Sequence, residues 1–243
     1  MTAIVLAGGK KSLLNELYPD LPPALVPLAE KPFLYWLTQW IKQQAFNQIV
    51  YGAGIHFDTI SAWANQQALL DADYCFDVFG ETRPLGTAGA TLQAAKRFPS
   101  EVFLVVNGDS LVLTDITPYL EKLKETPELD GMLIGANLNN AGRFGSLLVN
   151  EQGILEAFKE KQPSKALCNT GVYLLKQPLL EKLPSDKELS LEYDCFPKWI
   201  EQGKRFEVIP FDGPFIDIGS PESLSKVRET MVPFLKTLHA EPV

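Results

Sequence analysis

The chain has 243 residues, of which 46% are hydrophobic and 21% charged, as in an ordinary globular protein, so disorder is not expected. Its net charge of −8 argues against nucleic acid or an anionic membrane as the main partner. The first apolar segment is too short for a signal peptide or a membrane span. Three widely spaced cysteines, Cys75, Cys168 and Cys195, indicate reduced, buried thiols in a cytoplasmic protein without zinc.

Strand and helix patterns alternate through the first half of the chain. An unbroken apolar run at 102–106 is typical of a central strand that is buried on both faces. The alternation predicts an α/β fold with a mostly parallel sheet flanked by helices, in which ligands bind at the carboxyl ends of strands. The expected strands are 3–6, 48–51, 74–78 and 102–106, and the expected helices are 32–44, 58–70 and 91–97.

The second half predicts a small β elaboration of the same domain. We expect a hairpin with a glycine in its turn, further strands, and a last helix that Ser220 caps. The expected strands are 145–149, 154–158, 171–175, 206–210 and 215–218, and the expected helices are 190–201 and 221–235. One Rossmann-like domain is therefore predicted over residues 1–236, with a C-terminal tail over 237–243.

The most informative segment is the glycine turn after the first strand, which consists of Leu6, Ala7, Gly8 and Gly9. Because glycine lacks a Cβ, the backbone N–H groups of such a turn can approach a phosphate or a base. A second glycine-rich segment, 81–90, presents backbone N–H groups and a hydroxyl just before a helix, where an anion is favoured. A loop that binds no ligand uses the same residues. Neither segment alone therefore decides between a ligand-binding turn and an ordinary connection.

Two carboxylates lie at the ends of separate predicted strands. Asp109 follows the central apolar strand, and Asp217 alternates with two isoleucines, so that its side chain faces away from theirs. Two carboxylates from separate strand ends commonly hold Mg²⁺, which takes phosphate oxygens and waters as its other ligands. An aspartate that caps a turn is the alternative for either residue alone. Together with the glycine turn, the pair favours a magnesium site.

Further polar residues follow the predicted hairpin. Glu160 can accept hydrogen bonds from sugar hydroxyls, while Lys161 and Asn169 can donate to a phosphate or a hydroxyl. A solvated charge run is the alternative interpretation of 159–161.

Six segments, taken in order, resemble the motifs of the sugar-1-phosphate nucleotidylyltransferases over nearly the whole chain. They are 6–9, 84–89, 107–110, 160–161, 169–173 and 215–219. Three more, 19–22, 143–145 and 190–194, are similar to segments of D-glycero-α-D-manno-heptose-1-phosphate and mannose-1-phosphate guanylyltransferases. The resemblance implies transfer of a nucleotidyl group from a nucleoside triphosphate, with GTP favoured, to a heptose-type or mannose-type sugar-1-phosphate, with release of pyrophosphate. A homodimer is among the open oligomeric states.

The resemblance also implies roles for the residues at matching positions. Asp109 and Asp217 would hold Mg²⁺, and Asp109, Lys161, Lys10 and Lys11 would act in catalysis. Leu6, Ala7, Gly8, Gly9, Gly86 and Thr87 would bind the nucleotide. Asn107, Gly145, Glu160, Lys161 and Asn169 would bind the sugar phosphate.

The first motif departs from the family pattern, which continues Gly-Gly-x-Gly-Thr-Arg-Leu. Lys11 stands at the third glycine, Leu13 at the arginine that grips the triphosphate, and Pro23 at a downstream lysine. Losing a charge-assisted hydrogen bond of this kind costs roughly 1.5–3 kcal/mol. Lys10 or Lys11 could supply charge instead, as a less well oriented point charge, although two exposed surface lysines are the alternative.

Two functions therefore stay open. One is a working nucleotidylyltransferase whose triphosphate contacts are rebuilt around Lys10 and Lys11. The other is a regulatory homologue that binds a nucleotide sugar or sugar phosphate without making the nucleotide sugar. An NAD-dependent dehydrogenase is disfavoured, because Gly8 and Gly9 do not form the G-x-G-x-x-G pattern and no acidic residue ends a second strand at the required distance.

Overall fold

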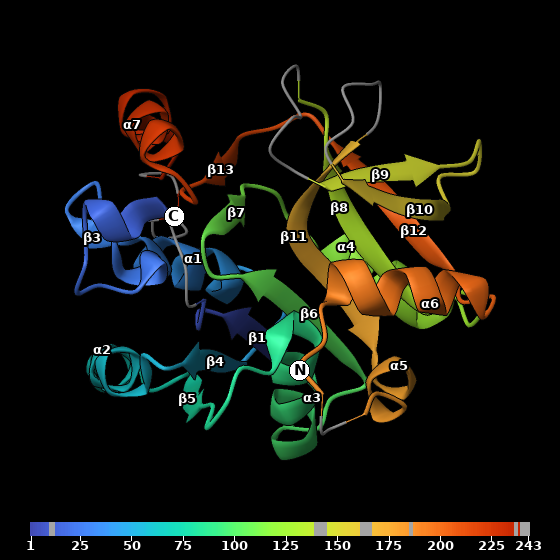
Figure 1. Cartoon of the computed structure of the whole chain (residues 1–243), viewed down its shortest axis with the longest axis horizontal. Coiled ribbons are helices and arrows are strands. Elements are labelled where there is room, and N and C mark those ends of the chain that lie inside the picture. The colour runs from blue at the N-terminus through green and yellow to red at the C-terminus, as the bar shows by residue number, and fades with distance from the viewer. Residues whose placement is uncertain (10–12, 139–144, 161–166, 185–186, 236–237, 239–243) are drawn as a thin grey trace. The chain divides into compact units, whose positions relative to one another are not determined.

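The computed structural model describes residues 1–9, 13–138, 145–160, 167–184, 187–235 and 238 (Figure 1). The chain divides by its internal contacts into two compact units, each of which is described by itself. The first unit comprises Met1–Arg83, Val106–Asp115 and Pro214–Val243, and the second comprises Pro84–Val105 and Ile116–Gly213. The predicted boundary between residues 236 and 237 stays a prediction, since nearly all of the tail lies outside the described residues.

Parallel strands form the centre of the first unit, where Ala3 lies opposite Ile49 and Ile49 opposite Phe76. Three of the predicted strands of this unit, and two of its predicted helices, are confirmed within a few residues. The strands are β1 (Thr2–Leu6), β4 (Gln48–Gly54) and β5 (Cys75–Gly80), and the helices are α1 (Phe33–Lys42) and α2 (Phe57–Leu70) (Figure 1).

Helix α1 shows why these segments fold as they do. Leu34, Leu37 and Ile41 recur at helical spacing and are fully buried. Thr38 lies on the same helix, and its hydroxyl is 2.9 Å from the hydroxyl of Tyr51 on β4. The apolar face therefore drives the packing, while this pair satisfies the polar groups that the packing buries.

Short elements complete the first unit. A two-residue turn of Ala29 and Glu30 joins two short strands, and both residues have positive φ angles, 49° and 67°. The last predicted helix is interrupted, because Pro233 lacks the N–H that would continue it. The elements are η1 (Leu13–Glu16), η2 (Pro23–Leu25), β2 (Pro27–Leu28), β3 (Lys31–Pro32), β7 (Ser110–Val112), β13 (Phe215–Asp217), α7 (Pro221–Thr230), which starts with the expected Ser220 cap, and α8 (Val232–Leu235).

The second unit contains the predicted β elaboration. Its strands pair in the order β10, β9, β11, β8 and β12, antiparallel except for the parallel pair of β8 and β12. The predicted hairpin is confirmed, and Gly153 in its turn has a φ of 75°. The strands are β8 (Gly131–Ala136), β9 (Gly145–Val149), β10 (Leu155–Glu160), β11 (Leu167–Lys176) and β12 (Phe206–Phe211) (Figure 1).

Two predicted helices of the second unit have different starts. The helix expected at 91–97 already begins at Gly86, so Gly86 and Thr87 lie in its first turn. The helix expected at 190–201 begins with a π-helical turn that Ser190 caps. The helices are α3 (Gly86–Arg97), α4 (Thr117–Glu125), α5 (Gln177–Glu181), the π turn η3 (Leu191–Cys195) and α6 (Phe196–Glu201).

The central strand β6 (Val102–Asn107) contributes residues to both units and is buried from Val102 to Val106, as expected. The fold is thus the predicted mixed α/β type, with parallel strands flanked by helices and β additions in the second half. Among the helices that the structure describes, none is long and apolar enough to cross a membrane.

Candidate functional site

The glycine turn of the first unit is held against the neighbouring strand. Ala7 donates its N–H to the carbonyl of Gly52 at 2.9 Å. A Cβ at Gly8 would lie 2.5 Å from the nitrogen of Gly54, so only glycine fits there. A Cβ at Gly9 would meet no atom of the described residues within 4 Å. Packing therefore requires the first glycine, while the second leaves its backbone open to a ligand.

The loop after β6 closes on the same turn. Gly108 donates its N–H to the carbonyl of Leu6 at 3.0 Å, and a Cβ on Gly108 would lie 2.9 Å from the Cα of Ala7. This close approach explains the glycine that precedes Asp109. It places Asp109 directly after a residue that contacts the glycine turn.

The two carboxylates meet at a third glycine. Strand β13 pairs with β7 so that Asp217 lies opposite Ser110, and Ile218 donates its N–H to the carbonyl of Asp109 at 3.0 Å. A Cβ on Gly219 would lie 3.5 Å from Oδ2 of Asp217 and 3.7 Å from Oδ2 of Asp109. Both half-buried side chains therefore lie near the same place.

The chemistry of this pair fits a magnesium ion. Mg²⁺ is bound in proteins by one or two carboxylates and completes its shell with waters and substrate phosphates. Within the described ranges, no three histidine, cysteine or acidic side chains cluster as a fuller protein cage would require. An ion held by Asp109 and Asp217 would thus depend on a phosphate ligand for further oxygens. Metal binding itself stays a prediction.

In the second unit, the start of α3 packs against the segment that precedes η3. Gly86 has a φ of +71°, and a Cβ there would lie 2.3 Å from the carbonyl oxygen of Leu189, so this position also requires glycine. The hydroxyl of Thr87 accepts the N–H of Leu191 at 2.8 Å and donates to Oε2 of Glu192 at 3.0 Å. The hydrogen of this hydroxyl and one of its two lone pairs are thus engaged within the unit, and its nucleotide role stays a prediction.

Asn169 on β11 belongs to the same hydrogen-bond network. Its Nδ2 donates to the hydroxyl of Tyr173 at 2.7 Å, and its Oδ1 accepts the N–H of Gly171 at 3.2 Å. The hydroxyl of Tyr173 in turn donates to Oε1 of Glu192 at 2.9 Å. The structure therefore joins Thr87 and Asn169 through Glu192, a residue that carried no assigned role in the sequence although it lies in the 190–194 segment.

The remaining predicted residues are less constrained. Asn107 ends β6 and belongs to the first unit. Gly145 starts β9 opposite Glu160, and a Cβ there would make only an ordinary contact, 3.6 Å from Phe158. Lys10, Lys11 and Lys161 lie outside the described residues.

Of the three positions that depart from the family pattern, the structure describes Leu13 and Pro23, and both lie in the first unit. Leu13 begins η1, and its side chain is 65% exposed. Pro23 begins η2 and is half-buried.

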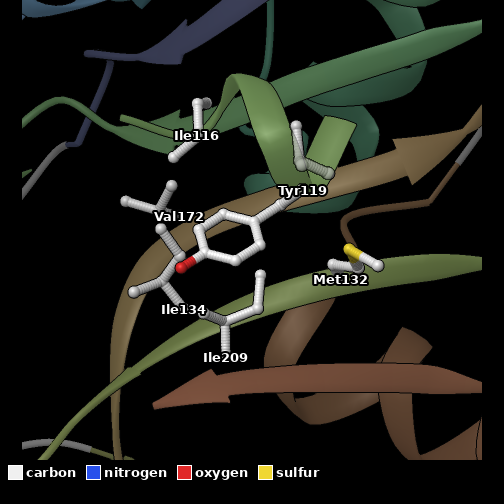
Figure 2. Close-up of a pocket in the computed structure, with 7 residues that line it drawn as sticks. Ile116, Tyr119, Met132, Ile134, Val172 and Ile209 are labelled. Atoms are coloured by element: carbon white, nitrogen blue, oxygen red, sulfur yellow. The ribbon is translucent and has the colours of Figure 1, made fainter. Parts of the chain in front are cut away.

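An apolar cluster in the second unit offers no ligand site. Figure 2 shows the ring of Tyr119, which lies on α4, among apolar side chains from three strands and from Ile116, the residue before α4. The seven lining side chains leave no space that a water molecule could occupy. They are Ile116, Tyr119, Met132, Ile134, Val172, Leu174 and Ile209, and they belong to the packed core of this unit.

The three cysteines are free thiols, as expected. Cys168 and Cys195 are buried, but Cys75 is exposed, contrary to the expectation that all three are buried. Cys75 is the first residue of β5, and side chains on alternating faces of a strand differ in exposure. Burial, reinforced by the negative charges of Asp194 and Glu192, raises the pKa of Cys195 to about 12.

Comparison with known proteins assigns the class. The model of the nucleotidyl transferase family matches residues 2–232, and the chain belongs to this family, within which its relatives are sugar-1-phosphate nucleotidyltransferases. It is 30% identical over 224 residues to a D-glycero-alpha-D-manno-heptose 1-phosphate guanylyltransferase of Campylobacter jejuni, covering 91% of this chain and 96% of the relative. The Aneurinibacillus thermoaerophilus protein of the same name is 28% identical over 233 residues, covering 95% and 98%.

Solved structures agree with this assignment. HddC from Yersinia pseudotuberculosis is 29% identical, with a TM-score of 0.79, and the match covers 95% of this chain and 99% of HddC. A structure of HddC complexed with GMP-PN matches with 28% identity and a TM-score of 0.78, over 95% of this chain and 99% of that one.

Proposed function

We propose that this protein transfers a guanylyl group from GTP to a sugar-1-phosphate of the heptose or mannose type and releases pyrophosphate. The convergence of Asp109 and Asp217 beside the glycine turn is the observation that carries this proposal. The names of the relatives support guanine as the base and a heptose as the sugar. We also propose a cytoplasmic location, and a homodimer stays a prediction.

The reaction needs no nucleophile from the protein. An oxygen of the sugar phosphate forms a bond to the α-phosphorus of GTP, and the bond from that phosphorus to the pyrophosphate oxygen breaks. The protein contributes by aligning two anions and stabilising the charge that develops between them. When bound, Mg²⁺ supplies neutralising charge to the phosphates, and Asp109 and Asp217 are the residues that would hold it.

The chain's own residues would bind and orient the substrates. The exposed Gly9 would bind the base and ribose, with Gly8 keeping the turn in place. Asn169 has one amide hydrogen beyond its bond to Tyr173, which it could donate to the sugar phosphate. Lys161 would supply positive charge for the same phosphate.

A regulatory homologue is the second candidate, and the departures at Leu13 and Pro23 favour it. An exposed leucine cannot replace the forked donors of arginine at a triphosphate, and proline carries no charge. Such a protein would keep the sugar-binding residues while losing catalysis.

A pyrophosphate-release assay on the natural chain and on a Leu13→Arg, Pro23→Lys double variant tests the proposal. With GTP, mannose 1-phosphate or heptose 1-phosphate, and Mg²⁺, we expect measurable release by the natural chain. If the two missing cations limit the rate, the double variant gains about a hundredfold to ten-thousandfold.

Absence of release in both proteins, across the common triphosphates and sugar phosphates, would contradict the proposal. Thermal shift then tests the regulatory alternative. Stabilisation by GDP-mannose without stabilisation by GTP would favour a binding protein, because only a ligand that prefers the folded state raises its melting temperature.

A further inference from the structure

Glu192 is the centre of a hydrogen-bond network in the second unit. Its carboxylate accepts three hydroxyl groups: that of Thr87 at 3.0 Å, that of Ser190 at 2.7 Å and that of Tyr173 at 2.9 Å. The donors come from α3, from the cap of η3 and from β11. One side chain of η3 thus ties this turn to α3 and β11.

The chemistry of the network gives each hydroxyl a direction. A carboxylate only accepts, so the single proton of Tyr173 points to Glu192, and its oxygen is left to accept from Asn169. The other end of the Asn169 side-chain amide faces the backbone N–H of Gly171. Because an N–H can only donate, the atom of Asn169 that meets it must be the oxygen Oδ1. These two ends together determine which way the amide of Asn169 faces.

The same reasoning applies to Thr87. The N–H of Leu191 donates to its oxygen, and its hydroxyl proton points to Oε2 of Glu192. Replacing one carboxylate oxygen of Glu192 by an amide NH2 group would weaken the charge-assisted bonds and leave either Thr87 or Tyr173 without its acceptor.

The network is also held rigidly. The side chain of Tyr173 is fully buried, and its ring lies 5.3 Å from the ring of Phe196, centre to centre. Ser190 accepts the N–H groups of Glu192 and Tyr193 at 3.1 Å each, which anchors the start of η3. Glu192 therefore starts from a constrained backbone position.

We propose that Glu192 is a positioning residue that sets the orientation of Thr87 for the nucleotide and of Asn169 for the sugar phosphate. This inference rests on the proposed function for the identity of the two ligands. It predicts that a substitution of Glu192 weakens the binding of both ligands. Substitutions of its partners Thr87 and Tyr173 should each weaken the binding of one ligand only.

Calorimetry with two probes, GTP and α-D-mannose 1-phosphate, tests this pattern. Glu192→Gln should weaken both by about tenfold, as the loss of a charge-assisted hydrogen bond implies. Tyr173→Phe, which keeps the buried ring, should weaken mannose 1-phosphate alone, and Thr87→Ala should weaken GTP alone. The control is Asp194→Asn, because Asp194 lies in the same turn and accepts the N–H of Ser190 at 2.7 Å. It should alter neither affinity.

A second readout needs no ligand. The side-chain amide signals of Asn169, assigned in nuclear magnetic resonance spectra by comparison with Asn169→Asp, should be protected from hydrogen exchange in the wild type and in Asp194→Asn. That protection should be lost in Glu192→Gln and Tyr173→Phe. A purely structural role would instead lower the melting temperature and weaken both probes equally in every variant, which would overturn the proposal.

The outcomes separate this inference from the proposed function. If wild-type protein binds neither probe but the Asn169 signals respond as described, the proposed function fails and the positioning of Asn169 stands. If wild-type protein binds both probes and Glu192→Gln leaves the affinities and the Asn169 signals unchanged, the positioning role is wrong and the proposed function stands.

Discussion

Ile218 donates its backbone N–H to the carbonyl oxygen of Asp109 at 3.0 Å. This bond continues the pairing of β13 with β7 and brings the loop that follows β6 beside the strand that carries Asp217. Both carboxylates consequently lie within reach of Gly219. A backbone contact between two segments that are distant along the chain thus creates the candidate magnesium site.

Removing one carboxylate should abolish most of the activity without unfolding the protein. Asp217→Asn should lower the rate of pyrophosphate release by at least about a hundredfold, because it removes charge at the site of the transferring phosphate. Asp212→Asn, at an exposed position, is the control and should retain the wild-type rate. Equal rates for both variants would show that Asp217 takes no part in the reaction.

The close approach of Gly108 to the glycine turn predicts a stability difference between two glycines. Gly108→Ala should lower the free energy of unfolding by about 1–3 kcal/mol, since its Cβ would lie 2.9 Å from the Cα of Ala7. Gly9→Ala, whose Cβ would meet no atom within 4 Å in the part of the chain that the structure describes, should leave that free energy nearly unchanged. Urea denaturation measures both values, and a destabilised Gly9→Ala with an unaffected Gly108→Ala would contradict the packing described.

The turn between β2 and β3 carries backbone strain. Glu30 has a φ of 67°, a region that glycine occupies readily and glutamate does not. Glu30→Gly should therefore raise the free energy of unfolding by roughly 1 kcal/mol, the order of strain relief expected at such a position. Glu30→Gln keeps the Cβ and removes only the charge, so it should give no such gain. A gain in thermal stability for Gln as large as that for Gly would point to charge instead of strain.

The buried thiol of Cys195 predicts that the free energy of unfolding depends on pH. Because burial raises the pKa of Cys195 from 9.0 in the unfolded chain to about 12, the unfolded state loses this proton first as the pH rises. The contribution of Cys195 to the free energy of unfolding is complete below about pH 9 and falls as the pH rises toward 12. Cys195→Ser should flatten this fall in denaturation curves recorded across that range.

The different exposures of the three cysteines predict how fast their thiols react. Iodoacetamide at pH 8 should modify Cys75 in the folded protein and spare Cys168 and Cys195, which are buried. Peptide mass spectrometry measures this directly, with protein in urea as the control in which all three react. Rapid modification of Cys195 in the folded state would contradict its burial.

Local patterns were sufficient to predict much of the fold. The apolar spacing of α1, the unbroken run of β6 and the Ser220 cap of α7 all depend on neighbours in the sequence, and all were predicted. The glycine turn could also be predicted, because the sequence itself shows which residues lack a Cβ.

Contacts between distant segments could not be predicted in the same way. Strand β7 has three residues and acquires its partner, β13, only through the tertiary fold. The early start of α3 depends on Leu189, whose carbonyl occupies the space that a side chain at Gly86 would need. Glu192 carries no local signal of its role, because its partners on α3 and β11 come together only in the folded unit.

The most direct test of the account is pyrophosphate release from GTP and a sugar-1-phosphate as Mg²⁺ is titrated from zero. If the two carboxylates hold the catalytic ion, release requires Mg²⁺ in the natural chain and is lost in both Asp109→Asn and Asp217→Asn. Release that persists in either variant, or that proceeds equally well without Mg²⁺, would contradict the account.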